Sequence, residues 1–162
     1  MGGITAEAAL ALVLAHTPVI QEKERLPVAE ISGRVLAEEA KTRFDNPPFS
    51  RSPIDGYACR AADLEGACRE QPVCLKVLRE IDAGDYSEEE VQPGKAVRIM
   101  TGAAIPPGCD CCVRQEDTDY GEETVQIYKA ERPWGNYCFR GEDFKAGQVL
   151  LQADRELGFV EA

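Results

Sequence analysis

The sequence predicts a mainly β fold with flanking helices, in the α+β class, and three observations favour it. Between residues 55 and 140, short runs with period-two alternation or β-branched residues are separated by turn signals. Glycine and proline make up about 15% of the 162 residues, slightly above the usual ~12%. The pattern of a convincing helix occurs before this region and not within it.

The helix is expected over residues 5–16. Thr5 is a suitable N-cap, and Pro18 stops the helix. Apolar residues recur at helical spacing along one side, which we interpret as a packing face formed by Ala6, Ala9, Leu10, Val13 and Leu14.

Strands are expected at 73–78, 96–100, 111–115, 124–128, 137–140 and 148–151, and shorter extended segments at 26–29 and 34–37. The pattern from Leu157 onward is typical of the start of a helix. We therefore expect the printed sequence to be part of a longer chain.

The charge balance is strongly acidic. With 29 acidic and 18 basic residues the net charge is −11, which disfavours nucleic acid and anionic membranes as partners. An anionic ligand would need Mg²⁺, helix N-termini or a partner subunit to hold it. The sequence has neither a run of ~18 apolar residues nor an N-terminal signal pattern, so we expect a cytoplasmic protein without a membrane span.

The cysteines number seven, and this odd count disfavours a disulfide framework. Cys109, Cys111 and Cys112 are close enough in sequence to suggest a metal site. However, zinc sites usually need a second such pair, and the one histidine, His16, ends the predicted helix. Core packing is the favoured interpretation, because cysteine is small and readily buried.

Asp55 lies on a restricted loop that begins at Asn46 and contains three prolines. Proline fixes φ, and Gly56 allows a tight turn directly after the acid, so this loop can hold a carboxylate in one place. Two interpretations stay open: a functional loop, or a rigid connector in which Asp55 caps the turn.

Two further turns combine reactive and hydrogen-bonding groups. Thr101 and Gly102 put a hydroxyl and unshielded backbone amides at a strand end, where they could bind an oxyanion, although Thr101 could instead bond to its own turn. Glu142 and Asp143 follow Gly141, and carboxylates from separate loops could together coordinate Mg²⁺.

Two other site patterns are disfavoured. The acidic run 116–123 resembles a calcium loop, but Glu122 stands where that loop needs glycine and Tyr128 where it needs glutamate. A solvated hairpin is expected there instead. Ser/His/Asp catalysis is disfavoured because His16 lies on the N-terminal helix.

Four motifs occur in an order that matches a known family. They are residues 46–49 with 52–58 and 60–63, then 96–103, then 115–117, and then 140–143 with Gly147. Together they resemble the N-terminal half of molybdopterin molybdenumtransferase, the MoeA family, which includes the E domain of gephyrin. The resemblance runs from about Leu26 to the last residue.

This resemblance implies an elongated, two-lobed architecture with an inserted small β domain. Residues 1–44 and 141–162 would form a split first domain and residues 45–140 the inserted second domain, while the pterin-binding third domain and the fourth domain are absent from this sequence. It further implies that the full enzyme is a homodimer that inserts molybdate into adenylated molybdopterin with the help of Mg²⁺ and releases AMP. The fragment alone is expected to be inactive, and a molybdopterin adenylyltransferase is a further expected partner.

The resemblance also implies roles for individual residues. Asp55, Thr101 and Asp143 would line the active cleft, the two aspartates orienting Mg²⁺ or substrate and Thr101 forming hydrogen bonds. The candidates for cofactor binding are Ser52, Gly56, Gly102 and Glu142.

The sequence departs from the family's usual small apolar residues at four cysteines, Cys59, Cys109, Cys111 and Cys112. This departure supports the packing interpretation of the thiols. As an alternative to enzymatic activity, the same fold could serve as a non-catalytic scaffold that binds a protein partner.

Overall fold

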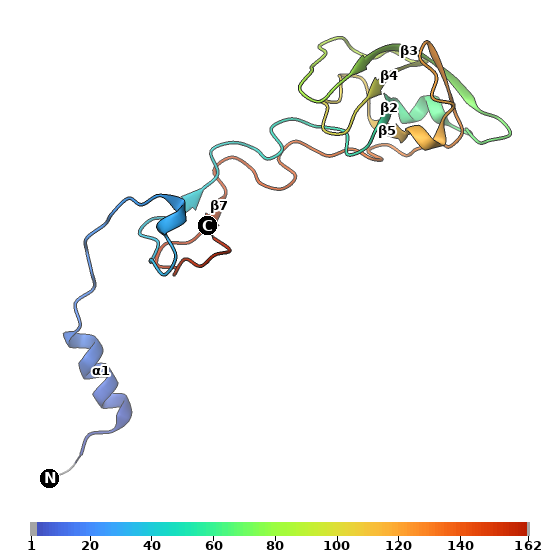
Figure 1. The fold of residues 1–162 in the computed structure, drawn as a ribbon. Coiled ribbons are helices and arrows are strands. Elements are labelled where there is room, and N and C mark those ends of the chain that lie inside the picture. Colours follow the sequence, from blue (N-terminus) through green and yellow to red (C-terminus); the bar gives the residue numbers. More distant parts are fainter. Residues whose placement is uncertain (1–2, 162) are drawn as a thin grey trace. The chain divides into compact units, whose positions relative to one another are not determined.

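The structure is a computed structural model that describes residues 3–161. It divides into two compact units: the smaller joins the residues up to Ala40 with those from Leu151, and the larger is Lys41–Leu150. Residues 41–44 and 141–150 thus belong to the larger unit, whereas the domain boundaries expected at 44/45 and 140/141 stay a prediction. Figure 1 shows strands of the main sheet, all of which lie within the larger unit.

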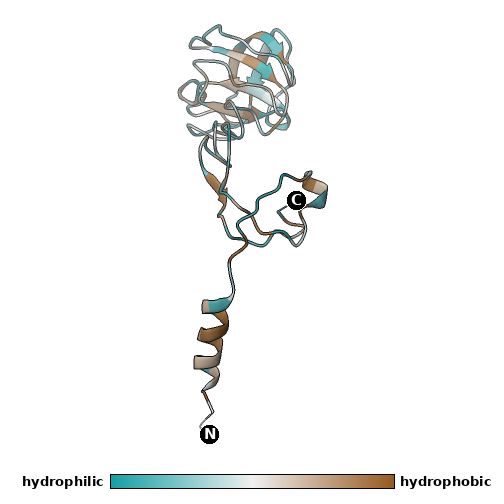
Figure 2. Ribbon diagram, turned by 90° about the vertical axis from the view of Figure 1, so that its left-hand side faces the viewer, coloured by the Kyte–Doolittle hydropathy of each residue, from teal (hydrophilic) through white to brown (hydrophobic). Residues whose placement is uncertain are grey.

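The smaller unit begins with helix α1 (Ala6–His16), as the sequence predicts. The Thr5 side chain accepts a hydrogen bond from the Ala8 amide at 3.2 Å, and Pro18 follows the C-cap Thr17. Apolar residues colour much of this helix in Figure 2. None of its side chains is buried within the described residues, and Leu10, Val13 and Leu14 are all more than half exposed.

The rest of the smaller unit is a short two-strand pairing. Gly33 donates its amide to the Leu157 carbonyl at 2.8 Å, Leu157 donates back to Arg34, and Val35 bridges Glu156. The extended segment expected at 26–29 is wrong in its second half, because Val28–Glu30 forms a 3-10 turn (η1) after Pro27. Pro27 is the N-cap of this turn, and its carbonyl accepts the Glu30 amide.

The helix expected from Leu157 onward is a turn in the described residues, which end at Glu161. The Gly158 amide donates to the Glu161 carboxylate at 2.9 Å, and Arg155 forms an ion pair with the same side chain. These side-chain bonds satisfy groups that a helix would pair along its backbone.

A two-stranded sheet pairs β1 (Ala40–Lys41) with β7 (Val149–Leu151). The neighbouring backbone continues the pairing, since Thr42 donates to the Gln148 carbonyl and accepts from Gly147. Strand β7 confirms the strand predicted at 148–151.

The larger unit contains a five-stranded sheet in the order β5-β2-β4-β3-β6. Its strands are β2 (Gly56–Cys59), β3 (Val73–Ile81), β4 (Lys95–Ile99), β5 (Cys111–Arg114) and β6 (Thr124–Ile127). Only the β3–β4 pair is parallel among the pairings of this sheet. Strand β2, which directly follows Asp55, is absent from the sequence prediction although it lies between β4 and β5.

Both faces of this sheet are covered by apolar residues. Along β2, Tyr57 and Cys59 belong to one core cluster with Leu64 of η2 (Ala61–Leu64), while Ala58 belongs to a second cluster with Ile99. This division follows the alternation of side chains along a strand. The sheet therefore provides a rigid base from which the loop containing Asp55 projects.

The core clusters contain the four cysteines that depart from the family's usual residues. Cys59 and Cys111 face each other across β2 and β5 with their sulfurs 3.8 Å apart, and Cys109 and Cys112 pack in the second cluster. Burial raises the pKa of the Cys112 thiol to about 12. The packing role expected for these thiols is confirmed.

Candidate functional site

The proline loop, residues 46–55, lies between two other segments of the larger unit. On one side, Gly102 donates to the Ser52 carbonyl at 2.8 Å, and Ser52 donates to Ala103 at 3.0 Å. On the other side, Arg51 and Cys138 exchange backbone hydrogen bonds, and Asp143 donates its amide to the Asn46 carbonyl. The segments that carry Thr101 and Asp143 thus both pack against the loop that ends at Asp55.

The strand expected at 137–140 is reduced to the single bridge between Arg51 and Cys138. Pro47 and Pro48 have no amide hydrogen and cannot extend a ladder along the loop. The Arg140 amide instead donates to the Ser50 hydroxyl at 3.2 Å, and Gly141 donates to the Pro47 carbonyl.

Asp55, at the end of this loop, is held by two hydrogen bonds from Thr101. The Asp55 Oδ1 atom accepts both the Thr101 hydroxyl and the Thr101 amide, each at 2.7 Å. Donation by the hydroxyl, and then by the amide, holds the pKa of Asp55 below its usual value. Asp55 therefore caps the turn at Thr101 rather than its own turn, and Thr101 bonds to Asp55 rather than to its own turn.

This geometry leaves one oxygen of the half-buried Asp55 for a ligand. All hydrogen bonds of its carboxylate to described residues go to Oδ1, so Oδ2 is the atom that can contact a cation or a donor. The Asp55 carboxylate is ionised at neutral pH, and the fixed Oδ1 sets its orientation.

The amides expected to be unshielded at Thr101 and Gly102 are both engaged, and this corrects the sequence interpretation. The Thr101 amide binds Asp55 and the Gly102 amide binds the Ser52 carbonyl, because the turn folds back onto the proline loop. Gly102 has a φ of +85°, a conformation that glycine adopts without strain. The assignment of Gly102 to cofactor binding stays a prediction.

Ser52 and Gly56 shape the loop from within. The Ser52 hydroxyl is buried and donates to the Ile54 carbonyl at 2.6 Å, which closes a local turn before Asp55. A Cβ atom at Gly56 would lie 1.9 Å from the Val113 carbonyl oxygen, so no side chain fits there. These two residues hold the backbone on both sides of Asp55.

Asp143 and Glu142 lie in the turn at the opposite end of the proline loop. Asp143 is exposed, and its Oδ2 atom accepts from the Asn46 side chain at 3.3 Å. Glu142 accepts the Phe139 amide at 2.8 Å, so its carboxylate caps its own turn. Asp55 thus ends the proline loop and bonds to Thr101, whereas Asp143 bonds to Asn46 at the start of the loop.

The two aspartates do not by themselves make a complete cation site. Within residues 3–161, no group of three or more histidine, cysteine or acidic side chains is arranged to hold a metal ion. Each aspartate can offer a carboxylate oxygen, and Mg²⁺ commonly binds one or two carboxylates and completes its shell with water and phosphate oxygens. Their assignment to Mg²⁺ stays a prediction.

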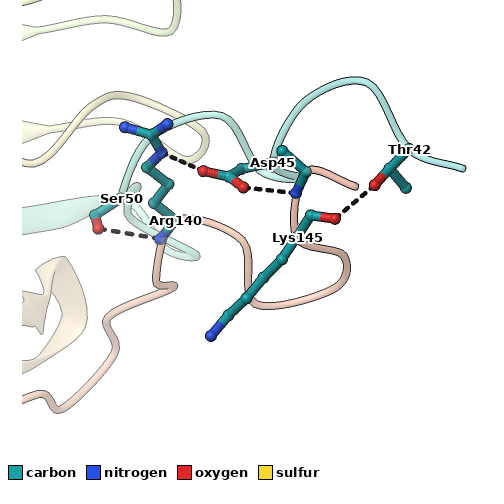
Figure 3. A network of polar contacts seen from close by, with 6 residues as sticks. Thr42, Asp45, Ser50, Arg140 and Lys145 are labelled. Atoms are coloured by element: carbon teal, nitrogen blue, oxygen red, sulfur yellow. Dashed lines mark hydrogen bonds and ion pairs between the residues drawn. The ribbon is translucent and has the colours of Figure 1, made fainter. Parts of the chain in front are cut away.

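The structure adds a pair that sequence reasoning missed, Asp45 and Arg140 (Figure 3). Asp45 accepts the Arg140 Nε–H through Oδ2 at 2.5 Å and the Ala146 amide through Oδ1 at 2.9 Å. The Ala146 amide and then Arg140 hold the pKa of Asp45 below its usual value. A signal existed: the acid directly precedes the proline loop, and the arginine directly precedes Gly141.

The Asp45–Arg140 pair ties together the ends of two distant segments. Figure 3 also shows Thr42 donating to the Lys145 carbonyl and the Arg140 amide donating to Ser50. These bonds fix the turn that carries Asp143 against the start of the proline loop.

Comparison with known proteins relates this chain to one protein family. A family model described as the MoeA N-terminal region (domain I and II) matches residues 4–162. The chain is 40% identical over 122 residues to a molybdopterin molybdenumtransferase of Staphylococcus epidermidis, and the aligned region covers 75% of this chain and 29% of that protein. It is 41% identical over 134 residues to the Bacillus subtilis protein of the same name, which covers 80% of this chain and 31% of that protein.

A solved structure is similar over nearly the whole chain. The crystal structure of the molybdopterin biosynthesis moeA protein from Pyrococcus horikoshii OT3 superimposes with a TM-score of 0.86 and 38% identity, covering 96% of this chain and 41% of that one. The mainly β architecture expected from the sequence is therefore confirmed. The chain spans about 30% of the length of these curated relatives.

The sequence predicts a protein without a membrane span. Within the part of the chain that the structure describes, no helix has the length and apolar character needed to cross a bilayer.

Proposed function

Since this chain belongs to the MoeA N-terminal region family, we propose that it forms part of a molybdopterin molybdenumtransferase of molybdenum cofactor biosynthesis. That enzyme inserts molybdate into adenylated molybdopterin and releases AMP. Because the chain spans about 30% of its curated relatives, further domains complete the active site, and the fragment alone is inactive.

The observation that carries this proposal is the Asp55–Thr101 contact. A carboxylate with one oxygen fixed by two donors is oriented before any ligand arrives. Asp55 acts as a catalytic residue that orients a cation or substrate through Oδ2, and Thr101 supports it by hydrogen bonding.

Asp143 acts from the other end of the proline loop. Its exposed carboxylate is available to a ligand, and the Asp45–Arg140 pair holds its turn in place. Ser52, Gly56, Gly102 and Glu142 contribute to cofactor binding by shaping the loops that carry these groups.

Mg²⁺ is the cation that this donor set suits, since Asp55 and Asp143 offer hard carboxylate oxygens. Among residues 3–161, neither aspartate belongs to a group of three or more side chains that could hold the ion. The remaining ligand oxygens come from water and from the phosphates of the substrate. The bound cation offsets the repulsion between these phosphates and a protein of net charge −11.

The enzyme works as a homodimer in the cytoplasm. Support for a subunit interface comes from α1, whose apolar side chains lie exposed in this chain and favour burial against another surface. Support for the cytoplasm comes from the seven free thiols. A molybdopterin adenylyltransferase is a partner because the adenylated substrate requires such an enzyme.

The test is Asp55→Asn in the full-length enzyme. This substitution keeps the side-chain size but removes the charge, and cofactor formation from molybdate and adenylated molybdopterin is expected to fall by at least about 100-fold. Asp63→Asn is the matched control, because Asp63 also caps a distant loop, accepting the Gly94 amide at 2.9 Å. Wild-type cofactor yield from a folded Asp55→Asn enzyme would remove the catalytic assignment.

A further inference from the structure

The larger unit contains a groove of about 370 Å³ with a mixed aromatic, apolar and polar lining, and neither Asp55 nor Asp143 lines it. It is open to solvent and joins residues from four loops. Prominent among its lining residues are Pro48, Tyr86, Pro106, Trp134, Tyr137 and Arg140. Tyr86 is 62% exposed and Trp134 is 54% exposed, so both rings present much of their surface to solvent.

Trp134 is held in this groove by a strained backbone. Its φ is +65°, in the left-handed region that a bulky residue rarely adopts, and Asn136 in the same turn has a φ of +48°. The turn is maintained because Trp134 donates its amide to Asp110 and the Asn136 side chain donates to the Cys112 carbonyl. The fold thus places an exposed indole where backbone preference alone would not.

The two aromatic rings at this wall of the groove, Trp134 and Tyr137, pack against each other and against a third ring, Phe139. Trp134 and Tyr137 are nearly perpendicular, at 85° with centroids 5.2 Å apart, and Phe139 packs within 5.4 Å of Trp134 and 4.8 Å of Tyr137. Such mutual packing restricts side-chain rotation, so a partner can bind without first ordering the rings.

The polar groups around the groove point to the character of the partner. The indole N–H of Trp134 and the hydroxyl groups of Tyr86 and Tyr137 have no hydrogen-bond partner within the described residues. Arg140 is the single ionised side chain in the lining, although the whole chain has a net charge of −11. Its Nε atom is fixed by Asp45, while the guanidinium has further donors and the side chain is 66% exposed.

We propose that this groove binds a proline-rich segment of a partner protein, in the polyproline II conformation, with an acidic side chain next to its prolines. The exposed rings of Tyr86 and Trp134 lie on different loops that line the groove, and such an aromatic lining suits the flat faces of proline rings. A polyproline II chain has no internal hydrogen bonds, so its carbonyls are free to accept from indole and phenol donors. The acidic side chain pairs with Arg140.

Trp134 makes the proposal directly measurable, because it is the only tryptophan in the chain. The probe is a blocked oligoproline peptide with one central glutamate, titrated into the 162-residue protein. We expect a saturable change in tryptophan emission with a shift to shorter wavelength as the indole leaves water. A peptide with glycine and serine in place of proline is expected to give no saturable change.

Two variants locate the binding surface. Tyr86→Ala, on another loop of the groove, is expected to weaken binding at least about fivefold. Tyr120→Ala is the matched control, since Tyr120 is also exposed, at 52%, but lies outside the groove. Its affinity is expected to stay within twofold of wild type. On the peptide side, replacing glutamate with glutamine is expected to weaken binding and to reduce its salt dependence.

Several results would overturn the proposal. They are the absence of a saturable emission change, equal affinity for the glycine–serine peptide, or equal weakening by Tyr86→Ala and Tyr120→Ala. Competition by AMP at the same surface would assign the groove to a nucleotide instead of a peptide. None of these outcomes bears on the activity of Asp55, so the two proposals can fail separately.

Discussion

Thr101 donates both its amide and its hydroxyl hydrogen to a single oxygen of Asp55, which lies 46 residues earlier in the chain. The two loops that carry these residues also pair through the backbones of Ser52, Gly102 and Ala103. Backbone pairing sets the distance between the loops, and the side-chain bonds then set the direction of the carboxylate. This division of tasks leads to the first prediction.

Thr101→Val removes the hydroxyl donor, which lowers the pKa of Asp55 more than the amide does. The substitution is expected to raise this pKa toward the ordinary value of ~3.9. Because the folded-state pKa is lowered, Asp55 contributes stability above its unfolded pKa and loses it as the pH falls through the folded value. The variant should therefore be less stable than wild type at neutral pH, and the difference should shrink in strong acid. A carboxyl NMR titration measures the pKa directly.

Thr124→Val is the control for this experiment, because Thr124 is an exposed threonine on β6. Its substitution should leave the Asp55 titration unchanged. An unchanged Asp55 pKa in Thr101→Val would show that the hydroxyl does not hold the carboxylate.

Gly56→Ala is expected to destabilise the larger unit by ~3 kcal/mol or more. The added methyl group would meet the Val113 carbonyl oxygen at 1.9 Å, and backbone on both sides of the contact must shift. Gly94→Ala separates this clash from a simple backbone effect, since Gly94 has a φ of +73° and open space around its missing side chain. That control should cost about 1–2 kcal/mol. Urea unfolding compares the two, and equal costs would contradict a steric role for Gly56.

The contact between Asp45 and Ala146 is expected to break at low pH. The amide and Arg140 lower the pKa of Asp45, so the ionised form persists below the ordinary aspartate value and protonates only in stronger acid. The Ala146 amide resonance should follow this titration in a heteronuclear NMR spectrum. Asp45→Asn should abolish the pH-dependent shift, whereas Glu38→Gln, in an exposed ion pair with Lys23, should leave it intact.

Thiol labelling at pH 8 is expected to distinguish the buried cysteines from the others. Cys74 is exposed and should react first, while Cys59, Cys109, Cys111 and Cys112 are buried and should react only on unfolding. With the pKa of Cys112 raised to about 12, almost none of it is thiolate at this pH. Mass spectrometry of the labelled peptides checks the order. Fast modification of Cys112 in the folded protein would contradict its place in the core.

Some elements were predictable because their signals are local. Helix α1 follows from Thr5, the alanine–leucine run and Pro18, and β3 to β6 follow from short alternating runs between turn residues. Strand β2 was not predictable in this way, because Gly56 and Ala58 have low strand propensity. It forms because both neighbouring strands pair with it and all four of its residues are buried.

In the candidate site, too, local signals were predictable from the sequence and long-range contacts were not. Asp55, Thr101 and Asp143 were recognisable from their motifs, but the partners of their hydrogen bonds were not. Asp45 escaped notice since its role depends on Arg140 and Ala146, about a hundred residues away in sequence. Trp134 carries no local signal of its position, because its φ and its packing against Tyr137 depend on the fold.

By itself the sequence determined the turn positions, the acidic character, the buried thiols and the motifs that indicate the family. Proline, glycine and apolar periodicity act over a few residues, so they can be read without knowing the fold. The tertiary structure alone decided which oxygen of Asp55 is occupied, which amides are engaged and which aromatic rings meet. Those contacts join loops far apart in the chain, and only the pairing of strands and loops in space brings their atoms within bonding distance.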